Sequence, residues 1–231
     1  HNISYIMLSL LYISYLYFLH GLVQVRIGLA ISFVLFAVYQ GIICRYFSIF
    51  VSFSIHQSSV VFYMYYAIKR YFILFKSRLF YLSYLIICFI IGSLMHHYFN
   101  DMLNMFIYYI PKVSMYYIES NDVLSGFGGK QLLFILFIIY FVFSSVNKQV
   151  SKCDMVVFNV FFFAFCVYLL MLSSPSISYR IFEIFEIFAI ISFCIVFKVR
   201  PIIGFIFSSL YIMLSIRAVF FIDNSLIQVF S

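Results

Sequence analysis

Three ionisable residues at the start of one apolar segment have the types and spacing that catalysis needs. Arg180, Glu183 and Glu186 lie three residues apart within the run at 178–186. In a helix this spacing places their side chains along one side, and the free amides of a helix N-terminus favour an anion. Arg180 can hold a phosphate with its planar guanidinium, and a carboxylate such as Glu183 can take a proton from a hydroxyl. The alternative is an Arg–Glu pair that only fixes helix packing.

A second polar group lies inside another apolar segment. His56 is preceded by Ser54 and followed by Gln57, Ser58 and Ser59. An imidazole in the middle of a membrane segment can transfer protons or bind a substrate, and ionisable residues at that depth are costly enough to suggest a function. The alternative is an interhelical hydrogen bond without catalysis.

Two further arginines stand beside apolar segments. Arg26 opens one of them and is followed by Gly28 and Ala30, small residues that permit close helix contact. Arg45 follows the same segment. Each arginine can bind an anion, or can serve only as an anchor that sets which side of a membrane the helix end occupies.

Signatures of metal and nucleotide sites are not found in the sequence. His96 and His97 have no third ligand at helical spacing, and the five cysteines are far apart without a Cys-x-x-Cys pair. The glycines at 126, 128 and 129 are not followed by Lys-Ser or Lys-Thr as in a phosphate-binding loop. We therefore expect no metal and no cofactor.

The composition excludes a soluble globular domain. Hydrophobic residues make up 66% of the 231 residues and charged residues only 9%, whereas about a quarter of an ordinary soluble domain is charged. So few charges cannot cover the surface of a folded chain in water. The net charge of +7 comes from dispersed basic residues, a distribution that does not favour a nucleic-acid partner.

The pattern predicts an all-α fold, a polytopic transmembrane helix bundle in a single integral membrane domain over residues 1–231. A spanning helix needs about 20 apolar residues, and by that measure there are about eight spans. They are expected at 3–19, 25–43, 46–67, 79–95, 131–146, 155–172, 180–197 and 201–221.

One connection, at 96–130, is much longer than the others. Its first part, 101–110, mixes polar and apolar residues as an interfacial helix lying flat on a membrane would. Long loops in compact bundles usually have a function.

Basic residues near the helix ends predict the orientation. Counting alternate connections places nine of the 14 on one side, which should be cytoplasmic: Arg26, Lys69, Arg70, Lys76, Arg78, Lys148, Lys152, Lys198 and Arg200. The outer side receives Arg45, Lys112, Lys130, Arg180 and Arg217. The long connection then becomes a periplasmic loop, and six of the seven acids, all but Asp154, face outward.

Three short runs resemble one family of membrane enzymes. The run Arg-Ile-Gly-Leu-Ala-Ile at 26–31 is similar to an Arg-x-x-Leu-Ala helix start, and the run at 53–59 is similar to a Phe-His-x-Ser element. The run at 179–185 resembles an Arg-x-x-x-Tyr/Phe-Phe helix start. In this order they resemble the EpsG/Wzy-type polysaccharide polymerases, which extend O-antigen or capsular chains.

The resemblance implies a glycosyltransferase at the periplasmic face of the bacterial inner membrane. A growing glycan on undecaprenyl pyrophosphate would be transferred to a sugar hydroxyl of a second lipid-linked repeat unit, without a nucleotide or metal. Arg180, with Arg26 or Arg45, would bind the departing pyrophosphate, and Glu183 or His56 would be the base. Besides this undecaprenyl-pyrophosphate-linked oligosaccharide, the implied partners are membrane lipid and a chain-length regulator.

Two features depart from the family pattern. The family has further helices and acidic residues ahead of the segment that begins at Arg26, so the chain, which starts at His1 and not at Met, is expected to be a fragment. The charge count also places Arg26 on the cytoplasmic side, whereas the family's chemistry takes place outside.

Other functions remain open on the sequence alone. A flippase or transporter for the same lipid-linked sugars would use intramembrane charges to line a path. A membrane acyltransferase would use His56 as its base. A purely structural membrane subunit would need none of these residues for chemistry.

Overall fold

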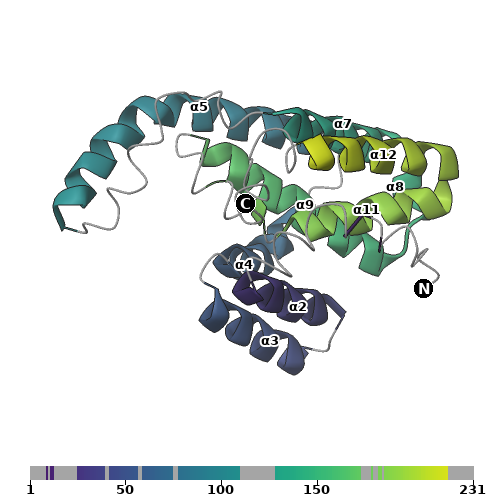
Figure 1. Cartoon of the computed structure of the whole chain (residues 1–231), viewed down its shortest axis with the longest axis horizontal. Helices are drawn as coiled ribbons and strands as arrows, with labels where there is room; N and C mark the ends of the chain where they lie inside the picture. Colours follow the sequence, from purple (N-terminus) through teal and green to yellow (C-terminus); the bar gives the residue numbers. More distant parts are fainter. Residues whose placement is uncertain are drawn as a thin grey trace, which may run out of the picture.

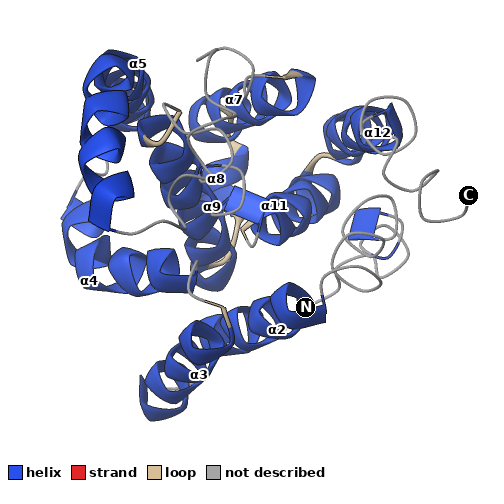
Figure 2. Cartoon of the chain, turned by 60° about the vertical axis from the view of Figure 1, so that its left-hand side comes forward, coloured by secondary structure: helices blue, strands red, loops and turns tan. Residues whose placement is uncertain are grey.

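The computed structural model describes residues 9, 11–12, 25–39, 42–56, 59–74, 78–109, 128–172, 178, 182–183 and 185–217. Every regular element within these ranges is helical (Figure 2), which confirms the all-α prediction. Figure 1 shows the helices in order: α2 (Val25–Tyr39), α3 (Ile42–Ile55), α4 (Val60–Leu74), α5 (Arg78–Tyr109), α7 (Gly129–Phe143), α8 (Val146–Gln149), α9 (Lys152–Leu170), α11 (Glu186–Val199) and α12 (Pro201–Arg217).

Two described segments are long and apolar enough to cross a membrane by length and composition, Arg78–Met95 in α5 and Lys152–Leu170 in α9. Four apolar helices are shorter: Gly28–Val38, Ile43–Ile55, Gly129–Phe143 and Pro201–Arg217. At about 1.5 Å per residue, a helix of about 15 residues covers less than the roughly 30 Å of a hydrocarbon core. The count of eight spans therefore stays a prediction, and most of the first span, 3–19, lies outside the described residues.

Several predicted boundaries are wrong. The span expected at 46–67 consists of two helices, because α3 ends at Ile55 and α4 begins at Val60. α11 begins at Glu186 and not at position 180. α5 continues to Tyr109, so the helix expected at 101–110 is the last part of α5 and not a separate element. The rest of the long connection, up to 127, lies outside the described residues.

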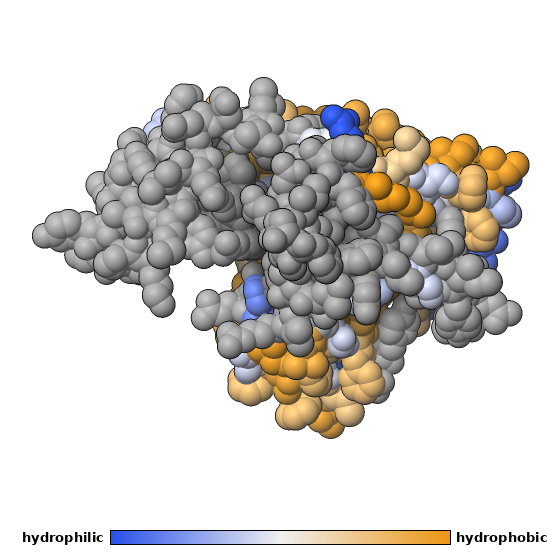
Figure 3. Space-filling model, in the orientation of Figure 1, coloured by the Kyte–Doolittle hydropathy of each residue, from blue (hydrophilic) through white to orange (hydrophobic). Residues whose placement is uncertain are grey.

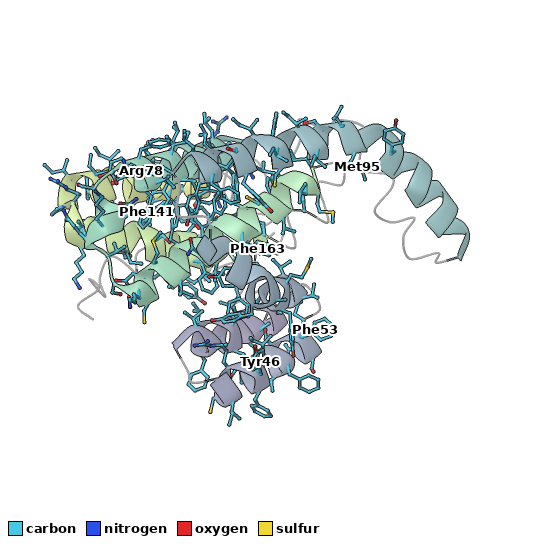
Figure 4. All side chains as sticks on the ribbon, turned by 180° about the vertical axis from the view of Figure 1, so that it is seen from behind. Tyr46, Phe53, Arg78, Met95, Phe141 and Phe163 are labelled. Carbon is cyan, nitrogen blue, oxygen red and sulfur yellow. The ribbon has the colours of Figure 1, made fainter. Side chains whose placement is uncertain are left out.

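The core is aromatic and centres on α9 and α11. Phe158, Phe161 and Phe165 of α9 and Phe188 and Phe193 of α11 are fully buried. In Figure 4 the labelled Phe141 lies within the bundle formed with α7 and α12, and Phe163 faces the part of the chain that holds α4. Such rings remove large apolar areas from contact with solvent, and their edge-to-face contacts add to that stabilisation.

Ring contacts tie these helices together. The rings of Phe141 and Phe158 stack with centroids 3.9 Å apart, joining α7 to α9. The ring of Phe137 meets that of Phe193 edge-on at 4.5 Å, joining α7 to α11. We call α7, α9, α11 and α12 the aromatic bundle.

Two glycines permit close approach of helix backbones. A Cβ atom on Gly92 would fall on the carbonyl oxygen of Leu169, where α5 crosses α9. A Cβ atom on Gly204 would fall on the backbone of Phe197, where α12 packs on α11. Small residues at such crossings are typical of membrane helix packing.

The aromatic bundle has two chemically different ends. α7 and α11 begin, and α9 and α12 end, at what we call the Glu186 end, where Lys130 meets Glu186. The opposite, basic end carries Arg78, Lys148, Lys152, Lys198 and Arg200. Arg78 donates to the Phe143 carbonyl at 3.4 Å, so α5 begins there too. This distribution agrees with the predicted grouping of the basic residues from Arg78 onward.

α2 and α3 form an antiparallel hairpin. Ser52 near the end of α3 donates to the Ala30 carbonyl at 2.9 Å, and Arg45 near its start donates to the Ala37 carbonyl at 3.0 Å. In Figure 3 apolar side chains cover much of the visible surface of this part, in agreement with the exposure of Ile43, Phe47 and Phe50.

The charge count places the start of α2 at the end of the molecule opposite the start of α11. In the structure both lie at the same end. Phe62, in the first turn of α4, has its ring centroid 6.5 Å from that of Phe185 and 6.2 Å from that of Phe188. The break between α3 and α4, and with it the start of α2, therefore lies toward the Glu186 end. Arg26 and the first turn of α11 are at the same end because the extra helix break reverses the direction of every helix before it.

Candidate functional site

A buried ion pair and a tyrosine hydrogen bond join three helices at the Glu186 end. Lys130 Nζ in the first turn of α7 lies 3.0 Å from Glu186 Oε1 in the first turn of α11, and their side chains are 10% and 3% exposed. The Tyr211 hydroxyl of α12 donates to the same oxygen at 3.0 Å. The Lys130 ammonium also lies 5.2 Å from the centroid of the Tyr211 ring. We call these residues the Lys130–Glu186–Tyr211 cluster.

Two favourable interactions meet at Glu186. Its carboxylate accepts charge-assisted hydrogen bonds, which are stronger than neutral ones. It also lies in the first turn of α11, where the helix dipole favours a negative charge. These interactions allow a carboxylate to stay in a largely apolar bundle, because a buried charge needs a partner.

Glu183 lies on a short segment that is anchored on both sides. Its side chain is buried, with 3% exposed. Phe182 packs its ring against those of Phe134 at 5.4 Å and Phe165 at 5.6 Å. A tight turn follows, in which the Phe185 amide donates to the Phe182 carbonyl at 2.7 Å. Glu183 is thus held between an aromatic anchor and the ion-paired Glu186.

Arg180, the first cation expected of the site, lies outside the described residues. Its neighbours on both sides that are described, Ser178 and Phe182, are buried. The expected side-by-side arrangement of Arg180, Glu183 and Glu186 therefore stays a prediction. The two acids both lie at the Glu186 end, as that arrangement requires.

His56 lies at a helix break and not in the middle of a helix. Its amide still donates to the Ser52 carbonyl at 2.9 Å, and its carbonyl accepts from the Ser59 amide at 3.0 Å. The buried Ser52 and Ser59 hydroxyl oxygens are 2.8 Å apart, at hydrogen-bond distance. α3 ends at Ile55, directly before His56, and α4 begins at Val60, so His56 lies between two helices and is partly exposed.

Arg26 lies in the first turn of α2, in a part whose backbone alone is described. Ala30 is one turn further along α2 and contacts Ser52, which is one turn before His56. The antiparallel hairpin consequently places the backbones of Arg26 and His56 at the same end. The charge count placed Arg26 and the start of α11 at opposite ends, and this relative placement is wrong.

Arg45 lies at the other end of the hairpin. Its Nε donates to the Ala37 carbonyl, one of the last carbonyls of α2, which have no partner within the helix. Its guanidinium also lies 5.0 Å from the centroid of the Tyr66 ring. These contacts are those of a residue that closes the α2–α3 connection, and the structure does not bring Arg45 together with His56.

Sequence reasoning missed two members of the cluster. Lys130 was counted as a topology signal, although it is the partner of Glu186 across 56 residues of sequence. Tyr211 is fully buried, whereas tyrosines in such a chain are usually assigned to the membrane interface. The only available signal was that the expected 131–146 and 180–197 spans both begin on the outer side.

Among the described residues there is no group of three or more His, Cys, Asp or Glu side chains that could hold a metal ion. At the Glu186 end the Glu183 carboxylate can accept a proton, for example from a hydroxyl, whereas the Lys130 ammonium is already paired with Glu186.

Comparison with known proteins assigns the chain to a family. A sequence model of the EpsG family matches residues 1–230, nearly the whole chain. Comparisons with curated proteins and with solved structures gave no match.

Proposed function

The chain belongs to the EpsG family, a family of membrane proteins of polysaccharide biosynthesis, and from this premise we propose that it is a repeat-unit polymerase. It joins undecaprenyl-pyrophosphate-linked oligosaccharides into O-antigen or capsular polysaccharide. It works as a multi-pass protein at the periplasmic face of the bacterial inner membrane. The Glu186 end of the bundle is that face.

The reaction transfers the growing chain to the next repeat unit. The bond between the anomeric carbon of the growing glycan and its pyrophosphate breaks, and the acceptor hydroxyl oxygen forms a new bond to that carbon. The hydroxyl proton passes to a base on the protein, and undecaprenyl pyrophosphate leaves. A cation at the pyrophosphate and a base at the hydroxyl each lower the barrier.

The observation that carries this proposal is the buried position of Glu183 beside the start of α11. In our proposal Glu183 is the base, and Arg180, three residues earlier in the sequence, binds the departing pyrophosphate. The family pattern supplies His56 and Arg26 as further members, and their shared end of the hairpin supports their participation. Arg45 is the weakest candidate for the second cation because its contacts lie at the other end.

The experiment replaces Arg180 and Glu183 separately by Ala in the full-length gene, in a strain whose polysaccharide depends on that gene. We expect single-repeat product and a normal level of tagged protein, because each residue serves the chemistry and not the fold. Asp154→Ala is the matched control, since Asp154 lies at the basic end, where its carboxylate accepts from Ser151 at 2.8 Å. The measurement is the ladder of polysaccharide chain lengths on a gel. If the ladder of a site variant is unchanged, the replaced residue is not part of the site.

The polysaccharide products of the variants also distinguish a polymerase from a flippase and from an acyltransferase. Loss of a polymerase leaves single repeat units outside the inner membrane, whereas loss of a flippase leaves no repeat units there. Loss of an acyltransferase leaves the length distribution unchanged and removes only the acyl group.

A further inference from the structure

Glu186, like Glu183, is a buried acid at the Glu186 end, and its contacts tie it to other helices. One oxygen of Glu186 receives both Lys130 and Tyr211 at 3.0 Å, so this carboxylate is held by two helices other than its own. These contacts suit a residue that fixes its helix better than one that must release and accept a proton in each cycle.

The contacts of Glu186 determine where Glu183 can lie. Glu183 is three residues upstream, and the turn between them is closed by hydrogen bonds from Phe185 to Phe182 at 2.7 Å and from Phe188 to Phe185 at 2.9 Å. A shift of the first turn of α11 would therefore move Glu183 with it.

Three side chains anchor this turn. Phe182 packs among the rings of α7 and α9, and Phe185 packs toward Phe62 of α4. Glu186 supplies the third anchor, toward α7 and α12. The Glu186 anchor depends on charge, so it can be weakened by an isosteric change that leaves the packing intact.

The two partners of Glu186, Lys130 and Tyr211, are themselves held in position by their helices. Lys130 is in the first turn of α7, directly after the helix start at which Gly128 donates its amide to Gln131 Oε1 at 2.9 Å. Tyr211 is fully buried against Phe193 and Phe134, with ring centroids 5.8 Å and 6.3 Å away. Neither partner can move far without disturbing the aromatic bundle.

We propose that the Lys130–Glu186–Tyr211 cluster is the positioning device of the active site, which holds the first turn of α11 so that Glu183 meets the acceptor hydroxyl. This inference rests on the proposed polymerase function. Glu186, Lys130 and Tyr211 are positioning residues that act through Glu183 and do not touch the substrate.

The test uses the purified full-length protein in lipid, with an undecaprenyl-pyrophosphate-linked repeat unit as substrate. Glu186→Gln keeps the shape of the side chain but removes its charge. We expect its kcat to fall by roughly 10- to 100-fold, since small misplacements of catalytic groups have effects of that order. KM should change by less than about threefold, because substrate binding is not altered.

Three further variants separate positioning from folding. Lys130→Arg keeps the charge and should retain kcat within about threefold, whereas Lys130→Met should match Glu186→Gln. Tyr211→Phe removes one hydrogen bond and should lower kcat a few-fold with little change in the unfolding temperature. It provides the measurement if Glu186→Gln does not fold.

The outcomes distinguish this inference from the proposed function. If Glu183→Gln is inactive while Glu186→Gln has normal kcat per folded molecule, Glu183 remains the base and the positioning inference is wrong. A raised KM at normal kcat in Glu186→Gln or Lys130→Met also overturns it, because it indicates substrate contact. If the wild-type protein makes no polymer from this substrate, the proposed function itself is wrong.

Discussion

The aromatic bundle and the α2–α3 hairpin have similar compositions but are held together by different interactions. In the bundle, phenylalanines such as Phe137 and Phe158 are fully buried. In the hairpin, Phe36, Phe47 and Phe50 are 53%, 67% and 59% exposed, and Ser52 and Arg45 of α3 donate hydrogen bonds to carbonyls of α2. The hairpin buries smaller side chains such as those of Val34 and Ile49, so the number of surrounding helices decides whether a large ring is buried.

The largest effect is expected where helix backbones touch. Gly92→Ala should greatly reduce the yield of folded protein, because the new Cβ would fall on the Leu169 carbonyl and push α5 away from α9. Overpacking against side chains typically costs about 1–3 kcal/mol, and the cost should be larger here because the new Cβ meets backbone, which cannot move aside without displacing the whole helix. The measurement is the amount of monodisperse protein after extraction in mild detergent. Gly128→Ala is the control, since its Cβ would meet only the Gln131 side chain at 3.2 Å. Equal yields of the two variants would contradict the close contact.

The next largest effect concerns the ion pair of the bundle. Glu186→Ala should lower the free energy of unfolding by about 3–5 kcal/mol, because it leaves Lys130 charged and buried without its partner. Replacing both residues, with Lys130→Met and Glu186→Leu, should recover much of that loss. Denaturation in micelles measures both. Additive losses in the double variant would show that the two side chains are not coupled.

A smaller effect is expected in the hairpin. Ser52→Ala removes the hydrogen bond to the Ala30 carbonyl and the contact with Ser59, which should cost about 1 kcal/mol. Ser54→Ala is the matched control from the same helix, because Ser54 is exposed and donates to the Phe50 carbonyl of its own helix. Thermal unfolding compares the two. A larger loss with Ser54→Ala would mean that Ser52 does not hold the hairpin.

The smallest effect separates two roles of Arg45. Arg45→Ala loses the bond to the Ala37 carbonyl and the contact with the Tyr66 ring, and cation–π contacts are worth about 0.5–1 kcal/mol at exposed sites. We expect slightly lower stability and an unchanged polysaccharide ladder. A ladder reduced to single repeats at a normal protein level would return Arg45 to the substrate site.

The sequence was sufficient to predict that two of the acids lie near each other. Glu183 and Glu186 were predicted to lie together on the outer side, and both are buried at the end opposite Arg78, Lys148 and Lys198. Residues three positions apart in one segment are close in space whatever the rest of the chain does, so this prediction does not require knowledge of the tertiary structure. The pairing of Glu186 with Lys130 could not be predicted in this way, because it depends on which helices are adjacent in space.

The break near His56 also escaped prediction. Residues 46–67 have the length and hydropathy of one span, and hydropathy does not register the direction of the backbone. The turn depends on Ser52 reaching both Ala30 of α2 and Ser59 beyond the break. The position of this break also shows that Arg26 lies at the same end as the first turn of α11, and not at the opposite end as predicted.

By itself, the sequence determined that this chain is helical, belongs in a membrane and has few ionisable residues for any chemistry, because these properties depend on each residue and the solvent around it. Only the tertiary structure decided that Lys130 and Tyr211 hold Glu186, that Arg26 and His56 share one end of the hairpin, and which phenylalanines are core. These properties belong to pairs of helices distant in sequence, and no single segment contains the information that brings the pair together.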